Sequence, residues 1–190
     1  MNTLFATATL MLALSLFGGQ AAAKALPRVE MATSHGTMII ELESDKAPLT
    51  TANFLRYSDE FHYDGVIFHR VIANFMIQSG GFNYDLSERP AAHPAVINES
   101  DNGLRNLRGT IAMARTNDPD SATAQFFINH RDNRALDARG QRPGYTVFGR
   151  VIEGLEVVDR IAQMPTRRYG PFQDLPRSTV QINRVRRLDN

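Results

Sequence analysis

Two short apolar segments, residues 68–72 and 75–79, stand close together near the middle of the chain. Both are rich in β-branched and aromatic residues, which predicts two strands joined by a tight turn. A two-residue loop would pair Ile72 with Phe75, whereas a three-residue loop would pair Ile72 with Met76. The choice of loop therefore decides which side chains face each other.

The residues themselves favour the longer loop, which spans 73–75. Asn74 tolerates the left-handed backbone conformation that such loops need. The longer loop also sets Arg70 opposite Gln78, which matches polar with polar across the strands. One face of the hairpin then carries a permanent cation and an amide among large apolar groups: Phe68, Arg70, Ile72, Met76 and Gln78. This face is either an edge whose arginine reaches out to water or a shallow apolar site with a fixed guanidinium on its wall.

The residues before this hairpin predict another hairpin and a helix. Residues 29–33 and 37–42 have the composition of strands and flank a turn at 34–36. From 48 to 59 the apolar residues follow helical spacing, with a proline in the first turn. A turn at 63–65 then leads into the central hairpin.

A long loop follows the central hairpin. Residues 82–110 hold several prolines and glycines among polar residues, and one short strand is predicted near Val96 and Ile97. A loop of this length inside a compact domain is usually functional.

The rest of the chain alternates strands with one more helix. Leu155, Val158 and Ile161 repeat at helical spacing, which predicts a helix over residues 154–164. A link rich in proline and glycine follows over 165–176. Four further segments are predicted as strands: 110–115, 125–129, 145–151 and 179–187. The helices are too few and too far apart for a parallel sheet, so we expect a mainly β fold, a closed eight-stranded antiparallel β-barrel capped by two α-helices.

The first 25 residues differ from everything after them. They contain no acidic residue, and their apolar run over residues 10–17 is too short to span a bilayer. Small residues follow, although no lysine or arginine precedes the run. The pattern predicts a signal peptide over residues 1–23, cleaved after Ala23 or, as the alternative, after Ala25. Residues 24–190 then form a single domain without a membrane anchor.

Composition narrows the possible partners. The chain is 43% hydrophobic and 22% charged, with a net charge of +1, and no basic run is interleaved with aromatics, so we expect no nucleic-acid partner. There is no cysteine, so an exported protein of this kind depends on its core and not on disulfides.

Several common chemistries lack support in the sequence. The five histidines show no metal-ligand spacing, and no glycine-rich phosphate loop precedes a helix. Ser121 follows two aspartates but has no histidine at a known triad spacing. What remains is Arg70 and Gln78, with Gln125 and Phe127 on one face of another strand. Such a site suits a reaction in which no covalent bond is made.

Taken in order, four motifs resemble those of the cyclophilins, in particular the exported bacterial type, over residues 29–188. The motifs are Phe68-His69-Arg70-Val71-Ile72, Phe75-Met76-Ile77-Gln78, Gln125-Phe126-Phe127-Ile128 and Val147-Phe148-Gly149. The resemblance implies peptidyl-prolyl cis-trans isomerase activity on proline-containing polypeptides in the periplasm, without a cofactor or a metal. A non-catalytic periplasmic chaperone that holds proline segments is the alternative.

The resemblance also implies roles for individual residues. Arg70 matches the family's catalytic arginine. The proline pocket is matched by Phe75, Met76, Phe127 and Leu136. Peptide contacts are matched by Gln78, Gln125 and the backbone of Ala114, Arg115 and Thr116.

Four positions depart from the best-known cyclophilins. Residues 73–74 are Ala-Asn where Pro-Gly is common, and Arg115 replaces an asparagine whose backbone makes the contact. Tyr145 replaces a pocket histidine. Ala135 stands where tryptophan or phenylalanine is usual, which weakens the pocket rim, so we expect weak binding of the cyclic peptide cyclosporin.

Overall fold

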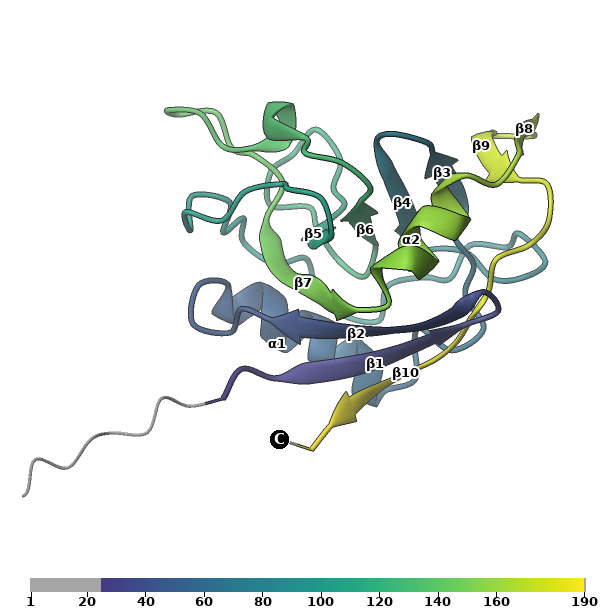
Figure 1. Cartoon of the computed structure of the whole chain (residues 1–190). Coiled ribbons are helices and arrows are strands. Elements are labelled where there is room, and N and C mark those ends of the chain that lie inside the picture. Colours follow the sequence, from purple (N-terminus) through teal and green to yellow (C-terminus); the bar gives the residue numbers. More distant parts are fainter. Residues whose placement is uncertain (1–24, 190) are drawn as a thin grey trace, which may run out of the picture.

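The computed structural model describes residues 25–189, which contain one large antiparallel sheet, two α-helices and a separate hairpin (Figure 1). The predicted signal peptide lies outside the described residues. In chain order the elements are β1 (Arg28–Thr33), β2 (Gly36–Leu42), α1 (Pro48–Asp59), β3 (Arg70–Ile72), β4 (Met76–Ser79), β5 (Thr110–Met113), β6 (Phe126–Asn129), the 3-10 helix η1 (Arg134–Leu136), β7 (Val147–Glu153), α2 (Leu155–Ala162), β8 (Thr166–Tyr169), β9 (Phe172–Pro176) and β10 (Ile182–Leu188).

The large sheet is not closed, so the prediction of a closed barrel is wrong. Its strand order is β10-β1-β2-β7-β5-β6-β4-β3, which leaves β10 and β3 as edges that do not pair with each other. The chain just before β3 meets the start of β10 over a short stretch only. One isolated bridge joins Ile67 to Gln181, the Phe68 amide donates to the Val180 carbonyl at 2.9 Å, and Ile182 exchanges two backbone hydrogen bonds of 2.8 Å with residues 65 and 66. This contact ends at Phe68, before β3 begins at Arg70, so β3 and β10 form no ladder and the sheet is an open half-barrel.

The stretch predicted as a link over residues 165–176 is a hairpin of its own. β8 and β9 pair from Thr166 opposite Pro176 to Tyr169 opposite Phe172, with Gly170 in a left-handed conformation at the turn. The large sheet has the predicted eight strands, and the β8–β9 hairpin raises the number in the described chain to ten. The short strand predicted near Val96 is reduced to an isolated bridge with Ala122.

Both helices bury apolar side chains in the interior of the half-barrel. α1 has the predicted bounds, begins with Pro48 and packs against β10, with Phe54 fully buried. α2 contacts β2, β3 and β4 and buries Val158 and Ile161. Among the described residues, no helix is long and apolar enough to cross a membrane.

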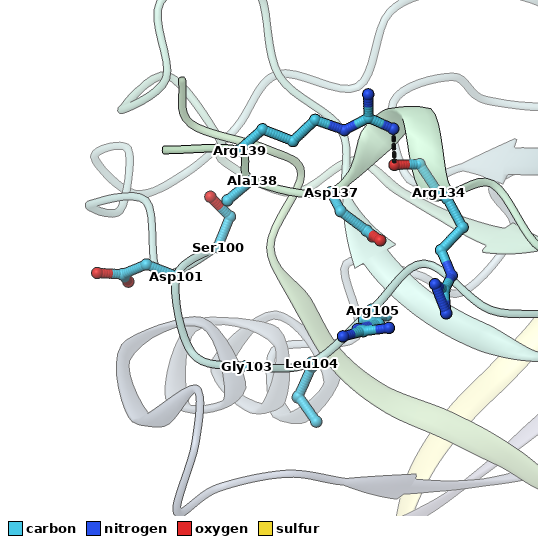
Figure 2. Close-up of a pocket in the computed structure, with 9 residues that line it drawn as sticks. All are labelled: Ser100, Asp101, Gly103, Leu104, Arg105, Arg134, Asp137, Ala138 and Arg139. Carbon is cyan, nitrogen blue, oxygen red and sulfur yellow. Dashed lines mark hydrogen bonds between the residues drawn. The ribbon is translucent and has the colours of Figure 1, made fainter. Parts of the chain in front are cut away.

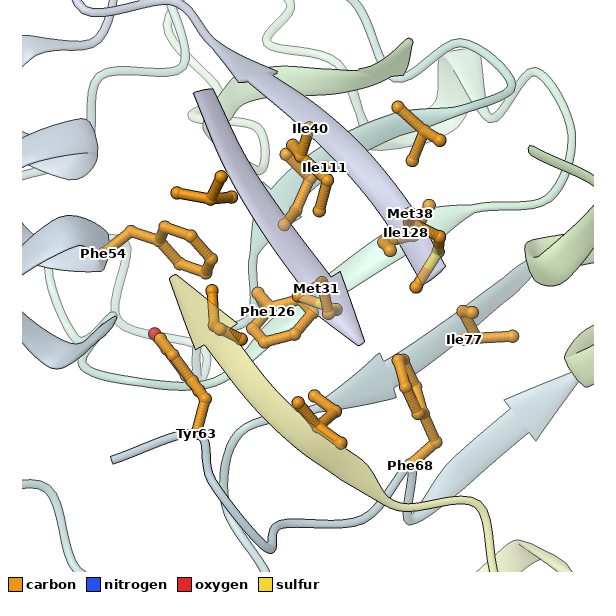
Figure 3. Packing of buried hydrophobic residues seen from close by; sticks show 14 of the residues in the cluster. Met31, Met38, Ile40, Phe54, Tyr63, Phe68, Ile77, Ile111, Phe126 and Ile128 are labelled. Carbon is orange, nitrogen blue, oxygen red and sulfur yellow. The ribbon is translucent and has the colours of Figure 1, made fainter. Parts of the chain in front are cut away.

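Aromatic rings fill the centre of this interior (Figure 3). Phe54 stacks on Tyr63 with ring centroids 5.0 Å apart, and Phe126 meets both rings edge-on. Phe68 is also fully buried here. The prediction that Phe68 shares a face with Arg70 is therefore wrong, because Phe68 precedes β3 and turns into the core.

A second, smaller apolar cluster lies on the other face of the sheet. Side chains alternate along a strand, so the neighbours of interior residues on β4, β5 and β6 point outward. The interior residues are Ile77, Ile111 and Phe126. Their neighbours Met76, Ala112 and Phe127 join Val147 in the outer cluster, whose members are all nearly inaccessible to solvent. Residues of this outer cluster form the base of the candidate site.

Candidate active site

The β3–β4 hairpin has the predicted three-residue loop. Arg70 lies opposite Gln78, and Ile72 lies opposite Met76. Asn74, in the loop, has a φ of 57°, the left-handed conformation for which an asparagine is suited. Because the register is as predicted, Arg70 and Gln78 reach the same side of the sheet.

These two polar side chains stand over a cavity of about 210 Å³. Met76 and Phe127 of the outer cluster form its apolar floor. Every residue that lines the cavity belongs to the predicted site: Arg70, Phe75, Met76, Gln78, Ala114, Arg115, Phe127, Leu136 and Tyr145. The structure thus brings together residues from β3, β4, β6, η1 and the loops between them.

Two of the predicted site residues do not line the cavity. Gln125 lies beside it and accepts a hydrogen bond from Gln78 Nε2 at 2.9 Å, which fixes the Gln78 amide. Gly81 makes room for this pair, since a Cβ on Gly81 would collide with the Gln125 side chain. Thr116 follows Arg115 in the chain, and its amide and hydroxyl are both bound to the Ser121 hydroxyl.

Tyr145 and Arg115 form one wall of the cavity. The Tyr145 ring meets Phe127 edge-on at 5.6 Å between centroids, and the Arg115 guanidinium lies 4.5 Å above the Tyr145 ring. Arg115 also donates to the Pro143 and Gly144 carbonyls at 3.1 and 3.2 Å. Its charged end is therefore fixed to this wall, which leaves Arg70 as the lining cation that faces the open side.

Arg70 has an acidic neighbour that sequence reasoning missed. Its Nε lies 3.5 Å from Oδ2 of Asp174, and the two side chains are 45% and 32% exposed. Asp174 lies on β9, within the stretch predicted as a link. Residues 172–176 show no alternation of apolar and polar side chains, so the sequence carries no periodic signal for this strand.

An aromatic contact sets the hairpin that carries Asp174 against β3. Phe172 packs edge-on against Phe82 and His69, with centroids 4.9 and 6.3 Å away. Phe172 and Asp174 are two residues apart on one strand, so both project from the same face. Phe172 holds the hairpin in place, and Asp174 lies next to Nε of the Arg70 guanidinium.

With this geometry in place, the profile of the family described as cyclophilin type peptidyl-prolyl cis-trans isomerase/CLD matches residues 28–187. The chain belongs to the cyclophilins. It is therefore a peptidyl-prolyl cis-trans isomerase, and relatives that carry that name favour the enzyme over a non-catalytic chaperone.

Alignments with similar proteins cover most of this cyclophilin. It is 53% identical to a peptidyl-prolyl cis-trans isomerase of Acinetobacter baylyi over 81% of each chain. It is 48% identical to peptidyl-prolyl cis-trans isomerase A of Dickeya dadantii over 94% of each chain. A crystal structure of a Cryptosporidium parvum cyclophilin matches its fold with a TM-score of 0.72 at 24% identity, covering 87% of this chain and 99% of the other.

The histidine next to Arg70 is not part of this cyclophilin's cavity. His69 is buried beside Phe82, and burial lowers its pKa to about 4. Its Nδ1 has no hydrogen-bond partner among residues 25–189. His69 is therefore neutral near pH 7 and serves as a packing partner for the hairpin that carries Asp174.

Proposed function

We propose that Arg70 is the catalytic residue of this isomerase and that the cavity beside it holds the proline ring of the substrate. The barrier to rotation about an X-Pro bond is about 18–20 kcal/mol and arises from amide resonance. The observation that supports the proposal is a partly exposed guanidinium at the edge of a small cavity with an apolar floor.

A guanidinium in this position favours the twisted amide over the planar one. Twisting the X-Pro bond ends the resonance and returns a lone pair to the prolyl nitrogen. An arginine that donates to that nitrogen binds a group that hardly exists in the ground state, so its effect is differential. Arginine suits the role because it stays protonated and offers several donors in a fixed fork.

The remaining site residues would hold the peptide while one side of it turns. Phe75, Met76, Phe127 and Leu136 would grip the ring, Gln78 and Gln125 would bind peptide polar groups, and the backbone of residues 114–116 would dock the chain. No bond between enzyme and substrate forms in this reaction, so its chemistry calls for no cofactor. Turnover of a short proline peptide, in an assay that reads one isomer only, tests the proposal directly.

The contact between Asp174 and Arg70 gives the first prediction. Asp174→Asn should lower kcat/KM about twofold to fivefold, because an exposed ion pair contributes at most about 1 kcal/mol. Most of the loss should fall on kcat, since Asp174 would orient Arg70 without touching the substrate. The Nε–H resonance of Arg70 should also move in ¹⁵N-edited NMR spectra.

A matched control separates this positioning role from surface charge in general. Glu30 forms a comparable surface ion pair with Arg184, 2.8 Å long, between β1 and β10. Glu30→Gln should leave kcat unchanged, and Asp174→Glu should restore part of the loss. If Asp174→Asn were as active as the unmodified enzyme and left the Arg70 resonance in place, Asp174 would have no positioning role.

We further propose that the enzyme is exported and assists the folding of proteins in the periplasm. The apolar run and the alanine-rich end of residues 1–25 support this. The alignment with the Dickeya dadantii relative covers 94% of this chain. This share is too large to exclude all of the residues before Arg28, so the relative has a counterpart to part of that segment.

Export predicts a defined start of the mature chain. Protein purified from its native host should begin at Lys24 or, for the alternative cleavage, at Leu26. Mass spectrometry of the intact protein distinguishes the two sites. Soluble cytoplasmic protein that still carries Met1 would contradict the proposal of export and leave the assignment of the active site untouched.

A further inference from the structure

A second cavity, of about 400 Å³, lies beside the proposed proline pocket (Figure 2). Its walls come from two segments that are distant in sequence, residues 100–105 of the long loop and residues 134–139 around η1. The proposed function leaves this cavity unused. Its position and its charges bear on which substrates the enzyme selects.

η1 separates the two cavities. Leu136 lines the proline pocket, whereas Arg134 and Asp137 line the second cavity. Leu104, another wall of the second cavity, packs against the outer cluster that forms the pocket floor. Ala135 lies exposed on η1 between them and offers no side chain beyond its Cβ. A peptide with its proline against Leu136 can therefore pass over η1 without obstruction from this side chain.

Some of the charged side chains that line the second cavity form hydrogen bonds within the protein, and others do not. Asp137 Oδ1 accepts hydrogen bonds from the Asn106 amide at 2.7 Å and from Asn106 Nδ2 at 3.1 Å. Arg139 donates to the Arg134 carbonyl at 3.0 Å. The guanidinium groups of Arg105 and Arg134 make no hydrogen bond or ion pair within the part of the chain that the structure describes. The same holds for the carboxylate of Asp101, which lies at the opposite side of the cavity (Figure 2).

These two guanidinium groups lie on the same side of the cavity in Figure 2. Both residues are exposed, and two like charges that face one space repel each other. An anion between them would relieve this repulsion. A carboxylate fits best, because the planar fork of an arginine matches its two oxygens.

We infer that this cavity is a second substrate subsite, in which Arg105 and Arg134 bind an aspartate or glutamate side chain near the isomerised proline. The inference rests on the proposed function of the neighbouring pocket. An extended peptide advances about 3.3 Å per residue, so an acidic side chain two or three residues from the proline is within reach of η1 and the cavity behind it.

Paired peptides test the inference. Each pair shares one X-Pro sequence and differs only by glutamate or glutamine, placed two or three residues to either side of the proline. At one of these positions the glutamate peptide should have a kcat/KM about threefold to tenfold higher at low salt, mainly through KM, as expected for contacts to charged groups. The preference should shrink in 0.5 M NaCl, where exposed charges are screened.

Variants connect the preference to the two arginines. The double variant Arg105→Gln, Arg134→Gln should lose the preference for glutamate, read as the ratio within each pair. Arg56→Gln is the control, because Arg56 is an exposed arginine on α1 that does not line this cavity. It should keep the preference, and circular dichroism should show all variants folded.

The outcomes separate this inference from the proposed function. An unmodified enzyme that turns over both peptides of every pair equally would overturn the acidic subsite and leave the proline pocket in place. A preference that persists in the folded double variant would assign the selectivity to other residues. An enzyme that turns over no proline peptide would contradict the proposed function itself.

Discussion

Replacing Arg70 by alanine should lower kcat/KM for X-Pro isomerisation by more than about a hundredfold, because the donor to the twisted amide nitrogen is lost. The protein should stay folded. The Arg70 side chain is 45% exposed, and its ion pair with Asp174 is 3.5 Å long. Its removal should therefore change the free energy of unfolding by less than about 1 kcal/mol, as is usual at the surface. A coupled isomerisation assay and thermal unfolding measure the two quantities.

Lysine at position 70 tests whether charge alone is enough. It keeps the positive charge but loses the planar fork and its reach. We expect Arg70→Lys to lose about tenfold to a hundredfold in kcat/KM, or about 1.4–2.7 kcal/mol of transition-state stabilisation. Arg184→Ala is a suitable control, since Arg184 is another exposed arginine with a surface ion pair, to Glu30. An Arg70→Ala protein that is folded and fully active would falsify the assignment.

The same mechanism predicts a flat pH profile for kcat/KM from pH 6 to pH 9. No proton leaves the enzyme during turnover, and a guanidinium stays charged across this range. Burial holds the pKa of His69 near 4, so this histidine is neutral throughout the window and protonates only below it. The resemblance to cyclophilins places Tyr145 where the family has a pocket histidine, so we expect no titrating histidine in the cavity. A bell-shaped profile with a limb near pH 6–7 would point to a histidine other than His69 and contradict the mechanism.

Local signals in the sequence were enough to predict the hairpin that carries Arg70 and Gln78, and also the first helix. Turn chemistry at Asn74 and polar pairing of Arg70 with Gln78 both indicate the register of the β3–β4 hairpin, which is confirmed. The bounds of α1 follow from Pro48 and the helical spacing after it. In each case the residues that decide the structure lie within a few positions of one another.

Long-range features were harder to predict. Closure of a barrel depends on how the two edges meet, and no local pattern encodes that β3 ends after three residues while β10 begins at Ile182. The β8–β9 hairpin was missed because β8, with the sequence Thr-Arg-Arg-Tyr, is mostly exposed and shows no apolar alternation. Asp174 was missed with it, since its contact with Arg70 joins residues more than a hundred positions apart.

The positions that line the cavity came from the resemblance to cyclophilins, and the structure gathers them around one space. Before the resemblance, the sequence pattern indicated Arg70, Met76 and Gln78 on one face of the hairpin, with Gln125 and Phe127 on another strand. Strand alternation explains why Met76 and Phe127 meet in the floor of the cavity, because both point away from the core that their neighbours fill. Leu136 ends the three-residue helix η1 and Tyr145 lies in the loop before β7, and segments this short or irregular give no periodic signal.

Cyclosporin should bind this cyclophilin at least about tenfold more weakly than it binds a relative with tryptophan at the position of Ala135, a loss of about 1.4 kcal/mol or more. Ala135 lies exposed on η1, directly before Leu136, which lines the cavity. A tryptophan there would add a large apolar surface and an indole donor at the rim. Tyr145 and Arg115 form a different wall and do not replace it.

Restoring the ring should recover part of the affinity. We expect Ala135→Trp to bind cyclosporin more tightly than the unmodified protein in titration calorimetry, whereas Ala91→Trp, which adds the same ring at another exposed alanine, should not. Recovery should be partial because Tyr145 still stands in place of the usual histidine. The new ring would also stand on η1 between the two cavities, so Ala135→Trp should reduce the preference for glutamate peptides. Tight cyclosporin binding by the unmodified protein would show that the rim at Ala135 contributes less than its position suggests.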